Sequence, residues 1–366
     1  MPMGLVLISP EDTMSEGTAF EQTEYAGQAY KTLNIKPLLF SAALWCLLAV
    51  LLVAGSGNLI TLRRYSPVSL RYNSPVSGQD AYRARQYAIE HGGEGSFWLS
   101  FWHESKESFS GEFSKVDAVC IFYSGDASLV WPAGYLAGTA PGVTDGAGCV
   151  VSSALARAIW GDVDIVGKTV EVDGRTRIVR GVFQGEDLLA LLSVRDEDTR
   201  QSYSAVELSG GPSAPARSDV ESFIMAAGLG RPDSILMDTP AFFASVLAAL
   251  PLVILAVYGF ALCIIQLKKR PAAIRGVLFF ALIGFAVLLP GLLDMLPGWM
   301  IPTRWSDFSF WGSLAKQTGE NLREYFTLAP RLRDVAYKIL LLKQAGISFI
   351  SVCCALIICC RWHVES

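Results

Sequence analysis

The residues from Gly161 to Thr169 have the types needed for phosphate chemistry, because two glycines precede a Lys-Thr pair. Five residues separate Gly161 from Gly167, whereas the nucleotide-binding loop requires four. The residues that follow predict a strand hairpin, so no helix N-terminus would be available to hold a phosphate. We therefore do not expect nucleotide binding at this stretch.

Residues for acid–base chemistry or metal binding are sparse. The three histidines are His91, His103 and His363. Glu104 and Glu107 follow His103, but no second histidine or cysteine stands at the spacing of a closed metal site. The sequence also has no Gly-x-Ser-x-Gly nucleophile elbow. We expect a non-catalytic protein with no cofactor and no metal site.

Two of the eight cysteines, Cys120 and Cys149, lie in the polar part of the chain. The others fall in or beside apolar stretches, where cysteine behaves as a small apolar residue. A disulfide between Cys120 and Cys149 is permitted if the polar part faces an oxidising compartment. The sequence leaves the bridged state and two separate thiols equally open.

Four apolar stretches divide the chain, one near its start and three near its end. A helix of about 20 such residues matches the roughly 30 Å hydrocarbon core of a bilayer and satisfies its own backbone hydrogen bonds there. The chain is 52% hydrophobic and 17% charged, too apolar for an ordinary soluble domain. The sequence predicts an α-helical membrane protein with four transmembrane helices. It also predicts a mixed α+β extracytoplasmic domain inserted between helices 1 and 2.

The short link between the second and third apolar stretches sets the expected orientation. It contains four cations and no acid, which is typical of a cytoplasmic loop. Lys31 and Lys36 before the first stretch agree with this orientation, whereas Arg63 and Arg64 after it do not. We expect a multi-pass protein of the cell membrane with both termini in the cytoplasm. The cations of the link are Lys268, Lys269, Arg270 and Arg275.

These expectations divide the chain into nine segments. They are a cytoplasmic tail with an interfacial helix (1–36), transmembrane helix 1 (37–62), the extracytoplasmic core domain (63–240), transmembrane helix 2 (241–267), the cytoplasmic link (268–275), transmembrane helix 3 (276–296), an extracytoplasmic aromatic-rich segment (297–337), transmembrane helix 4 (338–360) and a cytoplasmic tail (361–366).

Local patterns within residues 63–240 predict both helices and strands. The turn Asp173-Gly174 between two β-rich runs is a strong hairpin signal. Apolar spacing, capping residues and glycines mark the remaining elements. The expected helices are 79–91, 150–160 and 218–229, and the expected strands are 96–102, 116–123, 168–172 and 176–183.

Residues 149–183 resemble the MacB-type periplasmic core domain. In that family a Val-Val-Ser helix start precedes a Gly-Lys turn, a hairpin and a Val-x-Gly-Val strand. The matching positions here are Val150 to Ala156, Gly161, Gly167-Lys168, Val170, Val172, Gly174 and Val179 to Val182. Gly161 and Gly167 would let the helix reverse into a sheet edge, where a positive φ is needed.

The order of one span, a core domain and three spans is similar to that of a MacB/FtsX-type ABC transporter permease. This resemblance implies a non-catalytic subunit that transmits the motion of a separate ABC ATPase to the outer domain, for export of a peptide, lipoprotein or antibiotic. It implies an ATPase partner and a second permease copy or paralogue, within membrane lipid. Lys268, Lys269, Arg270 and Arg275 would then be where the ATPase docks, unless these cations only set the topology. The sequence has no basic patch with interleaved aromatics, so we do not expect a nucleic-acid partner.

Two features depart from the family pattern. The inner link has only about ten residues, and the outer segment before the last span is long. The short link favours an alternative function, a membrane receptor, scaffold or assembly factor that keeps a MacB-like domain without ATPase coupling.

Overall fold

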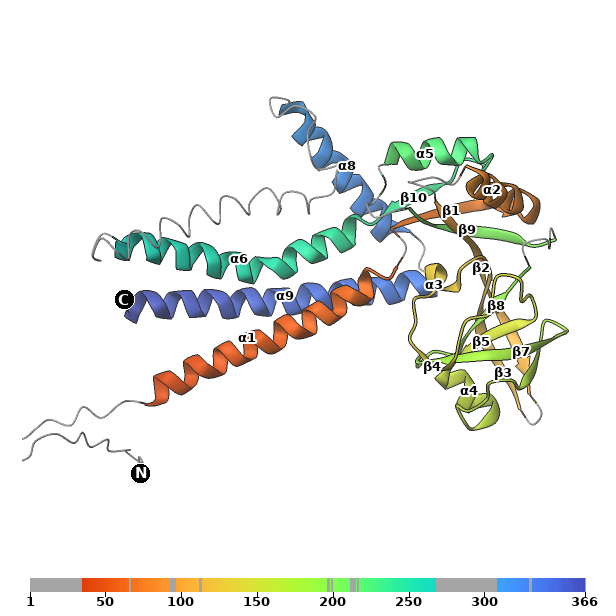
Figure 1. Cartoon of the computed structure of the whole chain (residues 1–366), viewed down its shortest axis with the longest axis horizontal. Coiled ribbons are helices and arrows are strands. Elements are labelled where there is room, and N and C mark those ends of the chain that lie inside the picture. Colours follow the sequence, from red (N-terminus) through yellow and green to blue (C-terminus); the bar gives the residue numbers. More distant parts are fainter. Residues whose placement is uncertain are drawn as a thin grey trace, which may run out of the picture.

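A computed structural model describes residues 35–65, 67–91, 97–111, 114–195, 198, 200–210, 215, 217–267, 308–328 and 331–365. Within these residues, three helices are long and apolar enough to cross a membrane: α1 (Ile35–Leu62), α6 (Thr239–Leu267) and α9 (Leu332–Glu365). They lie side by side, and the α+β domain stands at one end of them (Figure 1). The expected interfacial helix, cytoplasmic link and third transmembrane helix lie outside the described residues.

The last helix is longer than a membrane requires. Its 34 residues span about 51 Å, whereas the hydrocarbon core is roughly 30 Å thick. The first turn of α9 enters the α+β domain, where Arg333 and Asp334 are buried. The aromatic-rich segment before it contains a separate helix, α8 (Phe308–Thr327), that stands at an angle to the spans (Figure 1).

The α+β domain is built on one mixed sheet of ten strands between α1 and α6. The order of nine strands is β10-β1-β9-β2-β3-β8-β5-β7-β4, and most neighbours are antiparallel, with β3–β8 and β5–β7 parallel. The strands are β1 (Val68–Ser77), β2 (Trp98–Ser110), β3 (Lys115–Ser124), β4 (Tyr135–Gly138), β5 (Gly148–Ser152), β6 (Thr169–Val172), β7 (Arg175–Phe183), β8 (Leu189–Ser193), β9 (Ser202–Ser209) and β10 (Ser234–Met237); the helices are α2 (Gly78–Glu90), α3 (Ala127–Val130), α4 (Ser153–Trp160) and α5 (Arg217–Ala226).

One half of the sheet closes on itself. Strand β6 pairs with both β2 and β7, so the path β2-β3-β8-β5-β7-β6 returns to β2. A buried apolar cluster fills this half, with Phe109 from β2, Val151 from β5 and Leu155 from α4 among its members. A second cluster in the other half packs β1, β9 and β10 against α2 and α5.

Several local predictions are confirmed. Helix α2 and strands β3, β6 and β7 lie close to the expected bounds, and Asp173 and Gly174 adopt positive φ angles of 52° and 65° in the hairpin turn. Gly161 ends α4 in the left-handed region, and Gly167 also has a positive φ. The expected start of a helix at residue 150 is wrong, because Gly148–Ser152 is the buried strand β5 and Ser152 caps α4.

Candidate functional site: the junction between the sheet and the last helix

A cluster of charged side chains lies buried where α9 meets the sheet. Strand register brings its sheet members to one face, because Ser69 stands opposite Glu207 in the β1–β9 pair and Arg71 stands two residues further on. Trp102 on β2 lies beside β9 on the same face. Helix α9 supplies Arg333 and Asp334 from its first turn. We call Arg71, Glu207, Arg333 and Asp334 the ionic junction.

Glu207 is the centre of the ionic junction and is fully buried, with 0% exposure. Its Oε1 accepts hydrogen bonds from Ser69 Oγ at 2.6 Å, Trp102 Nε1 at 2.9 Å and Arg71 Nη1 at 3.1 Å. Arg333 Nη2 forms an ion pair with Glu207 Oε2 at 2.9 Å. Both carboxylate oxygens therefore have charged partners, which a buried carboxylate requires.

The second acid of the ionic junction links β1 to α9. Arg71 Nη2 donates to Asp334 Oδ1 at 2.7 Å. Burial alone would lower the pKa of Arg71, but Asp334 and Glu207 outweigh burial and raise the pKa. The four side chains carry two positive and two negative charges, so the ionic junction is neutral as a unit.

Further contacts hold the start of α9 against the domain. Arg333 Nε donates to the carbonyl oxygen of Val130 at 2.8 Å, and the backbone N–H of Leu332 donates to Glu104 Oε2 at 3.0 Å. The positive end of the helix dipole also stabilises a carboxylate at this position. The Arg331 guanidinium lies 5.2 Å from the Trp102 ring centre, and Arg71 lies 5.0 Å from the same ring.

Aromatic side chains extend the contact towards the other spans. The ring centre of Tyr337 on α9 lies 5.1 Å from that of Tyr65, after α1, and 5.4 Å from that of Tyr325 on α8. Tyr337 Oη donates to Asp238 Oδ1 at 3.3 Å, and Asp238 is the residue just before α6. Burial raises the pKa of Asp238 to about 7, against the opposing effects of this hydrogen bond and of Arg63.

Inside the membrane-spanning part, a polar contact joins α1 to α9. Asn58 Nδ2 donates to the carbonyl oxygen of Leu340 at 3.0 Å and to Gln344 Oε1 at 3.1 Å. Gln344 in turn donates to Ser348 Oγ at 3.3 Å. A Cβ atom on Gly55 would lie 3.4 Å from Gln344, so glycine allows the two helices to approach closely.

The side chains of His103, Glu104 and Glu107 contact an aromatic ring, the start of α9 and a serine hydroxyl. The imidazole stacks on Phe122 with ring centres 4.9 Å apart, and burial, followed by the charge of Arg331, lowers its pKa. Glu104 binds the N-terminus of α9, and Glu107 accepts from Ser105 Oγ at 2.5 Å. Among the described residues, no group of three or more His, Cys, Asp or Glu side chains could hold a metal ion.

Cys120 and Cys149 are buried free thiols. They lie on β3 and β5, which are separated by β8. Two strand spacings amount to about 9.6 Å, beyond the roughly 7 Å between Cα atoms that a disulfide allows. Burial raises the pKa of both thiols, to about 12 for Cys149.

The other predicted site residues, Lys268, Lys269, Arg270 and Arg275, lie outside the described residues.

The arrangement joins the sheet to the last helix through buried charges. The side chains of the ionic junction are paired with one another, and their contacts cross from two strands to one membrane helix. Sequence reasoning missed this site, because its members are brought together only by the sheet register. The available signal was a charged residue inside each of two β-rich runs, Arg71 and Glu207, since a charge in a buried strand requires a partner.

Comparisons with known proteins give structural matches only. No protein-family model matches the chain, and no curated protein matches it in sequence. One solved structure similar to part of it is the extracellular domain of the noncanonic ABC-type transporter YknZ from Gram-positive bacteria, with 12% identity, a TM-score of 0.34, and coverage of 44% of this chain and 90% of that one.

Two further structures give similar values. The periplasmic region of MacB from Actinobacillus actinomycetemcomitans has 13% identity and a TM-score of 0.40, covering 48% of this chain and 92% of that one. A domain of a putative permease protein from Porphyromonas gingivalis has 13% identity and a TM-score of 0.32, covering 45% and 81%. Each likeness concerns part of the fold alone.

Proposed function

We propose that the protein is a permease-type membrane subunit that passes the motion of a separate ABC ATPase to its α+β domain through the last helix. The observation that carries the proposal is the ionic junction, in which Arg333 and Asp334 of α9 bind Glu207 and Arg71 of the sheet. Removing one partner of a buried ion pair costs about 3–5 kcal/mol, so this contact resists separation. Helix α9 and the domain would therefore move together.

The motor would act on the opposite side of the membrane. The link with Lys268, Lys269, Arg270 and Arg275 is the segment that joins two apolar stretches there, and Pro271 restricts its backbone. A short, stiff link would move both adjoining helices as one, and α6, which packs against α9 through Leu255, Cys354 and Ile358, would pass that motion to the last helix. The domain would then open and close to expel a peptide, lipoprotein or antibiotic, with two permease subunits working as a pair.

The proposal is tested on the full chain purified together with the ATPase that binds it. Hydrogen exchange in the α+β domain would be compared with and without ATP. We expect ATP to change exchange in the domain of the wild-type protein. We expect Glu207→Gln to keep ATP turnover but to lose that change, because the sheet would no longer follow α9.

Arg83→Gln is the matched control, because it removes a charge from an exposed ion pair with Asp80 on α2. This variant should behave like the wild type. If Glu207→Gln also transmits the ATP response unchanged, the ionic junction is not the coupling element. If ATP changes nothing in the wild-type domain, the receptor or scaffold function is correct instead.

The docking role of the link has a separate test. Replacing Lys269 and Arg270 by Ala leaves Lys268 and Arg275 to hold the orientation. We expect ATPase binding to weaken by about tenfold, which corresponds to the loss of about 1.4 kcal/mol. Unchanged ATPase binding and turnover would leave the link with a topological role alone.

A further inference from the structure

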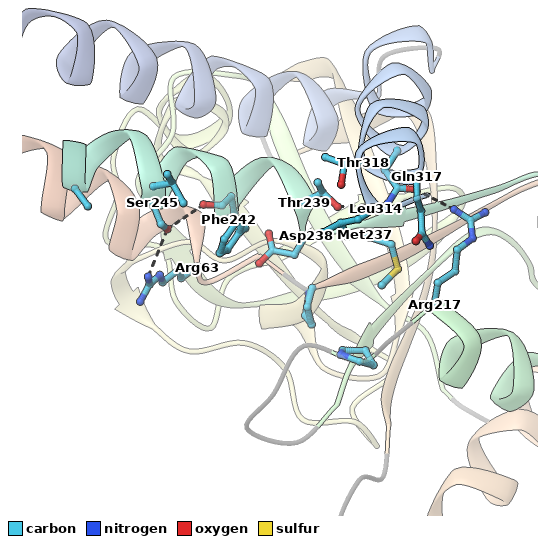
Figure 2. A pocket seen from close by; sticks show the side chains of 16 residues that line it. Arg63, Arg217, Met237, Asp238, Thr239, Phe242, Ser245, Leu314, Gln317 and Thr318 are labelled. Carbon is cyan, nitrogen blue, oxygen red and sulfur yellow. Dashed lines mark hydrogen bonds between the residues drawn. The ribbon is translucent and has the colours of Figure 1, made fainter. Parts of the chain in front are cut away.

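A pocket of about 460 Å³ lies between α6, α8, β10 and the start of α5. Figure 2 shows Arg63 and Arg217 on opposite sides of it, with Met237, Asp238 and Thr239 between them. The volume is within the roughly 300–1,000 Å³ typical of small-molecule sites. The pocket is separate from the ionic junction, since none of its lining residues belongs to that cluster.

The end of the pocket next to Arg217 is polar and internally bonded. Arg217 Nη1 donates to Asn321 Oδ1 at 3.0 Å, and its Nε donates to Glu221 Oε1 at 3.2 Å. Asn321 lies 3.5 Å from the hydroxyl of Thr239, and Thr318 also lines this end. Hydroxyl and amide groups here can bind a polar headgroup.

The end next to Arg63 combines a cation with apolar walls. Arg63 Nη2 donates to Ser245 Oγ at 3.4 Å, and within the described part of the chain this arginine forms no ion pair at 4.0 Å or less. Beyond Ser245 the lining residues on α6 are Val246 and Ala249, which are exposed. Both lie in a segment apolar enough to span a membrane, so this end is open to lipid chains.

We propose that this pocket binds an anionic glycerophospholipid from the membrane leaflet on the side of the α+β domain. The phosphate would pair with the Arg63 guanidinium, the headgroup would occupy the polar end at Thr239 and Asn321, and an acyl chain would lie along Val246 and Ala249. A pocket with the cation Arg63 beside an open apolar wall fits an amphiphile better than a free anion. The inference is independent of the proposed ATPase coupling.

The same cation and wall give the test its variants. Arg63→Gln removes the charge that faces the pocket, and Arg64→Gln removes the neighbouring exposed charge, which does not line the pocket. Ala249→Trp fills the apolar end. Leu247→Trp places the same side chain on the exposed surface of α6 outside the lining.

Native mass spectrometry of the full chain would measure binding of short-chain dihexanoyl phosphatidylglycerol, with dihexanoyl phosphatidylcholine as the neutral-head comparison and inorganic phosphate as competitor. We expect the anionic lipid to bind at least about tenfold more tightly than the neutral one. Arg63→Gln should remove that preference and Ala249→Trp should abolish binding. Arg64→Gln and Leu247→Trp should leave both unchanged.

Three results would overturn the inference. Equal binding of the two lipids would remove the role of the anionic head. Equal effects of Arg63→Gln and Arg64→Gln would mean that the pocket is not where the head binds. Full displacement by inorganic phosphate, together with normal binding to Ala249→Trp, would assign the site to a free anion instead of a lipid.

Discussion

Replacing Glu207 by Gln keeps the size of the side chain and removes its charge. The amide can still contact Ser69 and Trp102, which donate to Glu207 Oε1 at 2.6 and 2.9 Å. Arg71 and Arg333 then have one buried carboxylate between them instead of two. The ionic junction would carry one uncompensated positive charge where side chains are 0–4% exposed.

The expected loss of stability follows from that burial. Breaking a buried ion pair by removing one partner costs about 3–5 kcal/mol, because the remaining charge stays out of water. Arg83→Gln at the exposed Arg83–Asp80 pair, whose side chains are 64% and 44% exposed, should cost at most about 0.5 kcal/mol. The two charge removals should therefore differ by at least about 2.5 kcal/mol.

The assay is denaturant unfolding of the full chain in detergent, followed by tryptophan fluorescence. Adding Arg333→Met to Glu207→Gln restores the charge balance, because Arg71 and Asp334 remain paired. The double variant should recover about 1–3 kcal/mol of the loss. If Glu207→Gln costs no more stability than Arg83→Gln, or if the double variant is no more stable than Glu207→Gln alone, the reasoning about the ionic junction is wrong.

Three other predictions concern separate parts of the molecule. Asn58→Leu should lower stability by about 1 kcal/mol, measured by unfolding in mixed micelles, because the α1–α9 hydrogen bonds are lost; no change would mean that the contact is dispensable. Cys120 and Cys149 should appear as two free thiols in non-reducing mass spectrometry, and their raised pKa should keep them unreactive until the domain unfolds; a bridged peptide would contradict this. The folded state holds the proton of Asp238 up to a pKa of about 7, whereas the unfolded state releases it near the ordinary pKa of about 4. Stability should therefore fall as pH rises from about 4 to about 7 and change little above that. Thermal melts at pH 5 and pH 8 should show a smaller difference for Asp238→Asn, and an equal difference would mean that Asp238 does not titrate there.

Local signals in the sequence predicted the elements that depend on a few neighbouring residues. The Asp173-Gly174 turn and the end of α4 at Gly161 follow from backbone preferences, and α2 follows from the helical spacing of its alanines. Strand β8 (Leu189–Ser193) was missed because all five of its residues are buried, so it lacks the alternation that marks a strand with one exposed face.

The ionic junction depends on long-range pairing that a single sequence does not reveal. Arg71 and Glu207 are 136 positions apart and meet because β1 pairs with β9. Arg333 reaches them from the helix that enters the membrane. The expected fourth span began at residue 338, so these residues were assigned to the aromatic-rich segment before it. The pocket was missed for the same reason, since α6 and α8 form it together with Arg63 and Arg217.

The place where β1 and β10 pair has a mechanical consequence for the spans. Helix α1 ends at Leu62 and leads into β1 at Val68, while β10 ends at Met237 and leads into α6 at Thr239. Val68 and Met237 stand opposite each other in the antiparallel pair. The first two membrane helices are thus joined at their domain ends by the β1–β10 pair. If α1 and α6 separate, the distance between them must be smallest at this joined end and largest at their far ends, because separation at the joined end would break the hydrogen bonds between β1 and β10.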